Sequence, residues 1–259
     1  MKGEYIFNWI NDSKFIVSPG ETGLTGNFYF GLHEFEDMSF LLHYLNEEDT
    51  FVDIGANVGS YTILSGIIKK STVHSFEPIP STFKKLKRNI SINSKDNKIS
   101  LYNVGLGEEK GELFFTNNST STINHAVLNE SKKDSIKINV ETLDSYKINP
   151  TVIKIDVEGF EYFVLKGGYK SLINEELKCI IIELNESGEK YGQNQKEVFE
   201  YLISLGFKSY LYDPFNRNLT MINKINPSGN NTLFLRDSID FFNEKLKSSD
   251  KYLINGLYI

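Results

Sequence analysis

Acidic side chains beside glycine-rich turns are the residues of this sequence that point most directly to chemistry. Asp53 lies at the end of the apolar run Phe51–Ile54, and Gly55 and Gly59 follow in TFVDIGANVG. Glycines without a Cβ leave room for a ligand beside the backbone, and a carboxylate there suits a cation better than a pyrophosphate. Glu77 ends a second apolar run about one strand–helix–strand unit later, where an acid can bind ribose hydroxyls. We predict a site for a positively charged nucleoside such as S-adenosylmethionine; the alternative is a tight turn and a surface acid.

A second charged cluster follows another apolar run, in TVIKIDVEGFE. Lys154 lies inside that run, and Asp156 and Glu158 come directly after it. A buried ammonium without a partner is costly, so Lys154 is expected to pair with a nearby acid or with Glu183. Charges at the carboxyl ends of strands mark ligand sites in open α/β sheets, although a structural ion-pair cluster is the alternative.

These residues require alternating strands and helices to position them. Apolar runs predict core strands over residues 51–54, 71–76, 99–104, 152–155, 177–184, 207–212 and 231–236, and further strands over 14–18 and 27–30. Helical spacing of apolar residues predicts four helices. One spans residues 33–45, one begins at residue 60, one begins after an N-cap at Ser81, and one spans residues 198–205 and ends at Gly206. Residues 105–107 are expected to form a turn. The order indicates an α/β fold with a mostly parallel sheet.

Two regions outside these elements could reach the site. Residues 111–116 and 136–141 predict a hairpin, and the polar loop between them has the length of a lid; His125 in that loop is a weak candidate for the site. His33 and Glu34 start the 33–45 helix. We interpret them as a solvated first turn, and the alternative is that one of them lines the cleft.

Composition restricts the class of protein. A net charge of −6 disfavours a nucleic-acid partner, which requires a basic face. Cys179 is the single cysteine, so an internal disulfide is excluded, and segment 1–14 lacks the apolar core of a secretion signal. No apolar run has the length of a membrane span. We expect a cytoplasmic protein, and a homo-oligomer is left open.

The motifs FVDIGANVGSYT, FEPIPSTFKKLKRNI, NVGLGEEKG, VIKIDVEGFEYFVLKGG and IIIELNE, in this order, resemble the FkbM-type family of S-adenosylmethionine-dependent methyltransferases. The resemblance implies a Rossmann-like class I methyltransferase sheet of seven mostly parallel strands with helices on both faces. From the chain itself we expect an N-terminal cap with a lead-in helix (1–45), a methyltransferase domain (46–237) with a β-hairpin lid insertion, and a C-terminal tail packed on that domain (238–259); the cap, the lid and the tail contain none of these motifs. The family commonly has alanine where this chain has Gly105.

The resemblance also implies roles for individual residues. The cofactor-binding residues would be Asp53, Gly55, Asn57, Gly59, Tyr61, Glu77, Asn103, Leu106 and Asp156. Glu77 would hold the ribose, residues 103–106 would flank the adenine largely through their backbone, and Asp156 would face the sulfonium.

The predicted reaction is O-methylation of a sugar, glycan or natural-product hydroxyl. Asp156, Glu158 and Glu183 are candidate general bases, and Lys154 would orient them or stabilise an alkoxide. A Mg²⁺ ion held by Asp156, Glu183 and Asn185 is an uncommitted alternative. The rival functions are a dinucleotide-binding oxidoreductase and a non-catalytic binding module, and the absent GxGxxG motif counts against the first.

Overall fold

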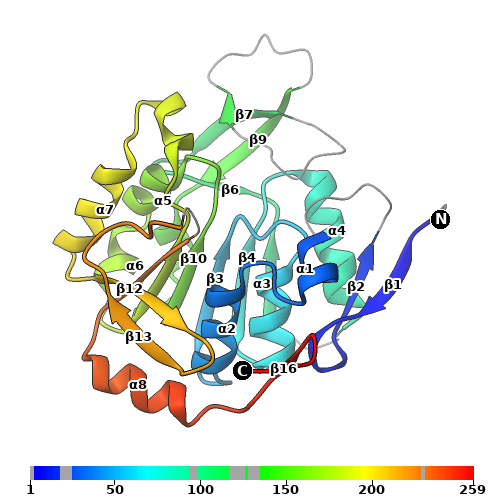
Figure 1. The fold of residues 1–259 in the computed structure, drawn as a ribbon. Helices are drawn as coiled ribbons and strands as arrows, with labels where there is room; N and C mark the ends of the chain where they lie inside the picture. The colour runs from blue at the N-terminus through cyan, green and yellow to red at the C-terminus, as the bar shows by residue number, and fades with distance from the viewer. Residues whose placement is uncertain (1–2, 18–24, 94–97, 117–125, 128–134, 229–230) are drawn as a thin grey trace.

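A large mixed β-sheet lies at the centre of the computed structural model, which describes residues 3–17, 25–93, 98–116, 126–127, 135–228 and 231–259 (Figure 1). Its strands, in order across the sheet, are β13 (Asn218–Met221), β12 (Lys208–Asp213), β14 (Thr232–Leu235), β11 (Cys179–Ile182), β10 (Val152–Ile155), β3 (Thr50–Ile54), β4 (Thr72–Phe76) and β5 (Ile99–Tyr102). Six strands run in one direction, whereas β14 and β13 run against them. The predicted α/β class and mostly parallel sheet are confirmed. The described residues add an eighth strand, β13, whose mostly exposed side chains give a weak sequence signal.

Helices cover both faces of this sheet. They are α2 (Phe35–Tyr44), α3 (Ser60–Ile63) with the π-helical turn η2 (Leu64–Ile68), α4 (Pro80–Ser91), α5 (Glu161–Gly167), α6 (Tyr169–Ile173), α7 (Gln195–Ser204) and α8 (Ile239–Lys247), with short 3₁₀ turns η1 (Ile10–Asp12), η3 (Leu143–Tyr146) and η4 (Glu186–Tyr191). Two predictions about helices are wrong. Residues 27–30 belong to a helix, α1 (Thr25–Phe30), and α4 starts at Pro80 after the cap residue Ile79, so Ser81 is not the N-cap. The fixed φ of proline suits the first helical position.

The pleat of the central strands distributes their side chains between two cores. Phe51 and Val152 pack in the core that contains α2 and α8, while their neighbours Val52 and Ile153 pack in the core that contains α5, α6 and α7. Successive residues of a strand point to opposite faces. Asp53 and Lys154 are therefore directed to the α2 side of the sheet, because each lies two residues after a side chain of that core.

A second sheet is inserted after β5. Its order is β6 (Gly105–Leu106), β9 (Ser135–Glu141), β7 (Gly111–Thr116) and β8 (Ala126–Val127). The predicted hairpin is present as β7 and β9. The expected turn at residues 105–107 is wrong in part, because Gly105 and Leu106 pair with β9 as a short strand. His125 and most of the predicted lid loop, residues 117–125 and 128–134, lie outside the described residues.

The two ends of the chain pack onto the domain. The hairpin of β1 (Tyr5–Asn8) and β2 (Lys14–Val17) contributes Phe15 to a core shared with α4, and α8 contributes Phe242 and Leu246 to the α2 core. The last hairpin, β15 (Leu253–Ile254) and β16 (Leu257–Tyr258), follows. The guanidinium of Arg217 donates to the backbone carbonyls of Leu246, Ser249 and Asp250 and so fixes the segment between them. Among the described residues, every helix is too short or too polar to cross a membrane.

Candidate active site

The candidate site lies where the connections of the central sheet diverge. Strands β3 and β10 are neighbours in the sheet. The next strand after β3, β4, lies on one side of this pair, and the next strand after β10, β11, lies on the other side. Ligands of open α/β sheets bind outside the carboxyl ends of strands at such a position. Two adjoining cavities lie there and share Gly55, Asn57, Asp156 and Glu158.

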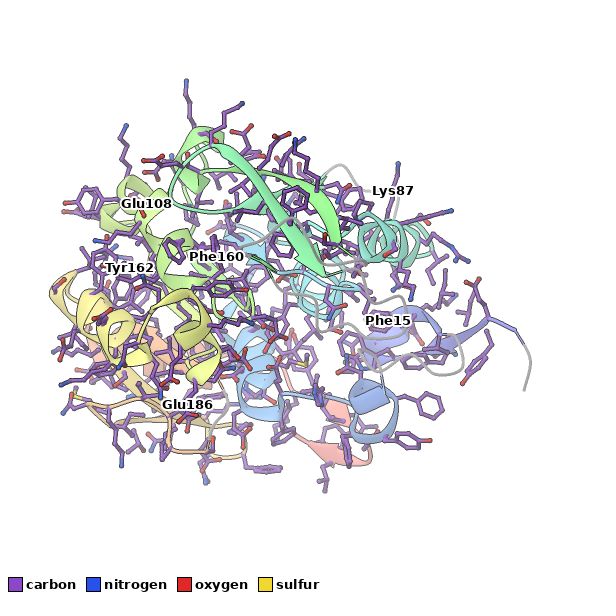
Figure 2. The ribbon with its side chains drawn as sticks, turned by 90° about the horizontal axis from the view of Figure 1, so that it is seen from above. Phe15, Lys87, Glu108, Phe160, Tyr162 and Glu186 are labelled. Atoms are coloured by element: carbon purple, nitrogen blue, oxygen red, sulfur yellow. The ribbon has the colours of Figure 1, made fainter. Side chains whose placement is uncertain are left out.

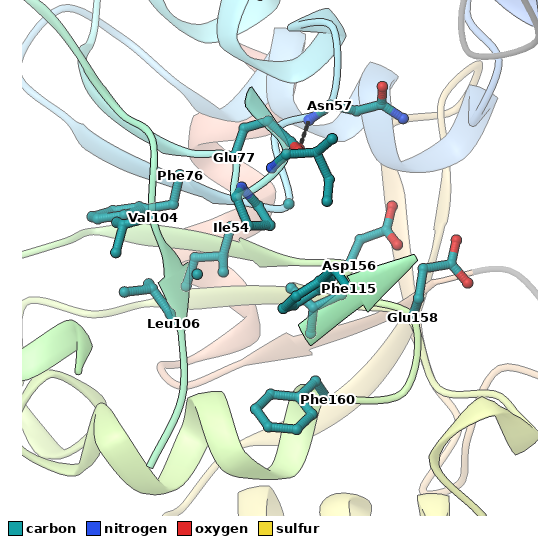
Figure 3. A pocket seen from close by; sticks show the side chains of 15 residues that line it. Ile54, Asn57, Phe76, Glu77, Val104, Leu106, Phe115, Asp156, Glu158 and Phe160 are labelled. Carbon is teal, nitrogen blue, oxygen red and sulfur yellow. Dashed lines mark hydrogen bonds between the residues drawn. The ribbon is translucent and has the colours of Figure 1, made fainter. Parts of the chain in front are cut away.

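The first cavity, called the apolar cavity below, has walls of opposite character (Figure 3). Phe76, Val104 and Leu106 lie at one end, and the carboxylates of Asp156 and Glu158 point toward the other. Such a cavity suits a ligand with a flat apolar part and a charged part.

Two aromatic side chains from outside the central sheet close the apolar cavity. Phe115 of β7 is buried with Ile138 of β9, and the partly buried Phe160 packs against this cluster. Seen from above, Phe160 lies near the middle of the molecule, between the β7–β9 hairpin and the η4–α7 segment (Figure 2). Neither residue was predicted for the site from the sequence: Phe115 lies outside the charged motifs, and Phe160, although it lies within TVIKIDVEGFE, is an apolar residue among the acids that gave that motif its signal.

Glu77 is a buried carboxylate in the wall of the apolar cavity. Its Oε2 accepts a hydrogen bond from the backbone N–H of Asn57 at 3.0 Å, and its Oε1 accepts one from Ile79 at 2.9 Å. Burial raises the pKa of Glu77 to about 8, although both hydrogen bonds favour the charged form. The two backbone donors fix the carboxylate in one orientation, and its remaining lone pairs can accept hydrogen bonds from a ligand.

The second cavity, called the polar cavity below, has a volume of about 310 Å³ and lies on the α2 side of the sheet. Asp53 is fully buried in its wall. The Oδ2 atom of Asp53 accepts a hydrogen bond from Thr62 at 2.7 Å, while Oδ1 has no hydrogen-bond partner among the described residues. Burial raises the pKa of Asp53 to about 6, opposed by the charge of Lys154. A buried acceptor without a donor indicates that a ligand with a donor belongs beside it.

Lys154 is the buried cation of the polar cavity. Its ammonium pairs with Asp156 at 2.7 Å, as the sequence analysis expected, and lies 4.7 Å from the centre of the Tyr61 ring. Burial lowers the pKa of Lys154, but Asp156, Glu34 and Asp53 outweigh burial and leave the pKa above its ordinary value. The buried ammonium of Lys154 therefore keeps its charge through neutral pH.

Three further carboxylates face the polar cavity, at Glu34, Glu158 and Glu183. Burial, followed by the negative charges of Asp156 and Glu158, raises the pKa of Glu183 to about 8. The same causes, burial and then Asp156, raise the pKa of Glu158. Glu183 thus combines a position in the cavity with a proton affinity suited to acid–base chemistry near neutral pH.

Gly55 and Gly59 of the first turn were both expected to leave room for a ligand, and the structure shows what a side chain would meet at each position. A Cβ on Gly55 would lie 1.8 Å from the carbonyl oxygen of Asp156, and one on Gly59 would lie 2.7 Å from Leu86. Their φ angles are +81° and +102°. Both glycines suit a left-handed backbone, but only Gly55 packs against backbone, because the atom nearest to a Cβ at Gly59 is the flexible end of Leu86. Gly55 lines both cavities, as expected for a residue that leaves room for a ligand, whereas Gly59 lines neither.

The other residues named from the sequence divide between the cavities and the surroundings. Asn57 and Leu106 line the apolar cavity, and Tyr61 lines the polar one. Asn103 lines neither; its exposed side chain donates to the backbone carbonyls of Glu77 and Pro78 and supports that turn.

His33 and Glu34 both line the polar cavity together with Asn27, which agrees with the alternative interpretation, although the His33 side chain is also exposed to solvent. Glu34 accepts a hydrogen bond from Asn231, which precedes β14. No local pattern in the sequence links these two residues. For the Mg²⁺ alternative, the described residues contain no group of three or more His, Cys, Asp or Glu side chains arranged to hold a metal ion.

Comparisons with known proteins agree with this architecture. The model of the methyltransferase FkbM domain matches residues 53–209. The chain is 30% identical over 165 residues to the hexuronic acid methyltransferase AglP of Haloferax volcanii, covering 62% of this chain and 64% of that protein. It is 27% identical over 149 residues to Methyltransferase 1 of Beauveria bassiana, covering 46% of this chain and 59% of that protein. The chain thus spans less than two thirds of the length of either relative.

A solved structure supports the fold. The crystal structure of methyltransferase FkbM from Methylobacillus flagellatus superposes with a TM-score of 0.51 at 18% identity, over 74% of this chain and 44% of that one. The family match includes the ends of β3, β4, β10 and β11, which carry the acidic residues of both cavities. This chain therefore belongs to the methyltransferase FkbM domain family.

Proposed function

We propose that this chain transfers a methyl group from S-adenosylmethionine to a hydroxyl of a sugar-containing acceptor. The observation that carries the proposal is the pair of adjoining cavities, one with an apolar end and the fixed Glu77 carboxylate, the other with acids around the buried Lys154. Membership in the family agrees with methyl transfer, and the printed name of the Haloferax volcanii relative, a hexuronic acid methyltransferase, supports a sugar as acceptor.

The donor set of the cavities fits S-adenosylmethionine. Phe76, Val104 and Leu106 offer apolar contact to an adenine, and Glu77 offers acceptors to ribose hydroxyls. The unpartnered Oδ1 of Asp53 offers an acceptor to an ammonium. When bound, S-adenosylmethionine supplies an electrophilic methyl group on a positively charged sulfur. The carboxylates shared by the two cavities match that charge.

Glu183 is proposed as the general base. Asp156 is already paired with Lys154, whereas Glu183 faces the same cavity with a raised pKa. The acceptor hydroxyl would lose its proton to the Glu183 carboxylate as its oxygen forms a bond to the methyl carbon. The bond between that carbon and the sulfur would break at the same time, and its electron pair would leave on the sulfur of S-adenosylhomocysteine. Lys154, held between Asp156 and the Tyr61 ring, stabilises negative charge that develops on that oxygen.

The proposed base predicts a pH profile. Because only the deprotonated form of Glu183 accepts a proton, kcat/KM should rise about tenfold per pH unit below an apparent pKa near 8 and level off above it. The apparent value belongs to the coupled acids around Glu183. Rates measured with acceptor well below its KM and with saturating S-adenosylmethionine, between acidic and alkaline pH, test this. A profile that is already flat through neutral pH would exclude Glu183 as the base.

Glu77 provides the test of cofactor binding. At pH 9, where a Glu77 carboxyl with a pKa of about 8 is ionised, Glu77→Gln should weaken S-adenosylhomocysteine about 10- to 100-fold in titration calorimetry, as expected for losing hydrogen bonds to a charged acceptor. The wild type should also discriminate against a 2′,3′-dideoxy analogue, and the variant should not. Thermal denaturation shows whether the variant keeps its fold. Tight binding of NAD, with no response to S-adenosylhomocysteine, would favour the oxidoreductase alternative and contradict the proposal.

A further inference from the structure

We propose that a pocket beside the polar cavity binds a neutral sugar unit of the acceptor, next to the unit that is methylated. The pocket has a volume of about 270 Å³ and lies between η1, α1 and the C-terminal β15–β16 hairpin. This inference rests on the proposed function, because it extends the acceptor beyond the site of methyl transfer.

The lining of this pocket has the chemistry of a saccharide site. Three aromatic rings face it, from Phe7, Trp9 and Phe28, and the amide side chains include those of Asn8, Asn11 and Asn255. Among the described residues, none that lines the pocket carries a charge. Amides both donate and accept hydrogen bonds, as sugar hydroxyls do, and aromatic faces cover the apolar C–H faces of a pyranose ring.

Asn27 connects this pocket to the polar cavity. It is 2% exposed and lines both spaces. Its Nδ2 donates to the hydroxyl of Ser60 at 2.7 Å and its Oδ1 accepts from the backbone N–H of His33 at 2.9 Å. Ser60 and His33 themselves line the polar cavity. The two spaces therefore adjoin at Asn27, and the sugar unit next to one held beside Glu183 and Lys154 would lie close to the pocket.

The charge difference between the two spaces argues for a neutral unit in the pocket. The polar cavity contains Glu34, Asp53, Asp156, Glu158 and Glu183 around one lysine, whereas the pocket is uncharged. A phosphate or an anionic lipid headgroup would require cationic partners, which the pocket lacks. An uncharged, amide-lined pocket of this size fits a neutral polyhydroxy group.

The pocket contains its own spectroscopic probe. Trp9 is the only tryptophan of the chain, and its indole N–H donates to the carbonyl of Gly31 in the same pocket. Tryptophan fluorescence therefore comes from a single ring in the wall of this pocket, and the comparison of Phe28→Ala with Phe30→Ala assigns a change in it to the pocket. The probes are tetrasaccharides of glucose, mannose, galactose and N-acetylglucosamine, each compared with its methyl monosaccharide, added to protein saturated with S-adenosylhomocysteine.

Phe28→Ala tests the pocket, and Phe30→Ala is the matched control. Both residues are exposed phenylalanines of α1, but only Phe28 lines the pocket, so neither change removes a buried side chain. At least one tetrasaccharide should change Trp9 emission more strongly than its monosaccharide. Phe28→Ala should weaken that binding about tenfold, which corresponds to roughly 1.4 kcal/mol, and Phe30→Ala should leave it unchanged.

The outcomes separate this inference from the proposed function. If no tetrasaccharide changes Trp9 emission, or if the two variants behave alike, the pocket is not a sugar site. Methyl transfer from labelled S-adenosylmethionine to a monosaccharide glycoside would then still support the proposed function. If S-adenosylhomocysteine itself fails to bind in calorimetry, the proposed function fails, whereas a selective response of Trp9 to tetrasaccharides would still support the pocket.

Discussion

Replacing Glu183 by glutamine is expected to lower kcat by about 10²- to 10⁴-fold, the usual contribution of a general base. Glutamine keeps the size of the side chain, but its amide cannot accept a proton from the acceptor hydroxyl near neutral pH. Binding of S-adenosylhomocysteine should change little, because the contacts proposed for it are made by Phe76, Val104, Leu106, Glu77 and Asp53 and do not include Glu183. Single-turnover methyl transfer, combined with calorimetry, separates these two quantities. The rise of kcat/KM toward pH 8 should also disappear.

Glu186→Gln is the matched control for this variant. Glu186 is exposed, lies three residues further along the same segment, and lines neither cavity. It should retain wild-type kcat. Equal losses in both variants would show that general disturbance of this segment, and not loss of a base, explains the result. Activity that disappears with EDTA and returns with Mg²⁺ would instead favour metal activation of the hydroxyl.

The largest effect on stability is expected from Gly55→Ala. The new methyl group would lie 1.8 Å from the carbonyl oxygen of Asp156, and alanine would have to adopt a φ of +81°. Strain in the left-handed region and overlap with a backbone atom together should lower the free energy of unfolding by about 3–5 kcal/mol. Urea denaturation measures this change. Because Asp156 would have to move, cofactor binding should weaken as well.

Gly105→Ala is the control for Gly55→Ala. A Cβ at Gly105 would find its nearest atom, Cγ2 of Val140, at 3.5 Å, which is an ordinary contact. Its φ does not lie in the left-handed region. We expect the free energy of unfolding to stay within about 1 kcal/mol of the wild-type value. This agrees with the resemblance, which suggests alanine at this position. Equal destabilisation by both changes would contradict the steric explanation for Gly55.

The sequence by itself determined the order of the core elements and the acids at the ends of their strands. The apolar run 51–54 contains Asp53 and is followed by Gly55, and the run 152–155 is followed by Asp156. This local pattern was sufficient to predict parallel strands that carry a ligand site. The pair of Lys154 and Asp156 was also predictable, because a buried ammonium requires an acid nearby and these two residues are close in the chain.

Only the tertiary structure decided which distant residues complete the cavities. Glu34 and Asn27 reach the polar cavity from the segments around α1 and α2, and Phe115 covers the apolar cavity from the inserted β7 strand. Their positions depend on packing between segments far apart in the chain, which the short periods of helices and strands do not encode. The same holds for Gly55, where the neighbour that forbids a side chain is the backbone of Asp156, about one hundred residues away.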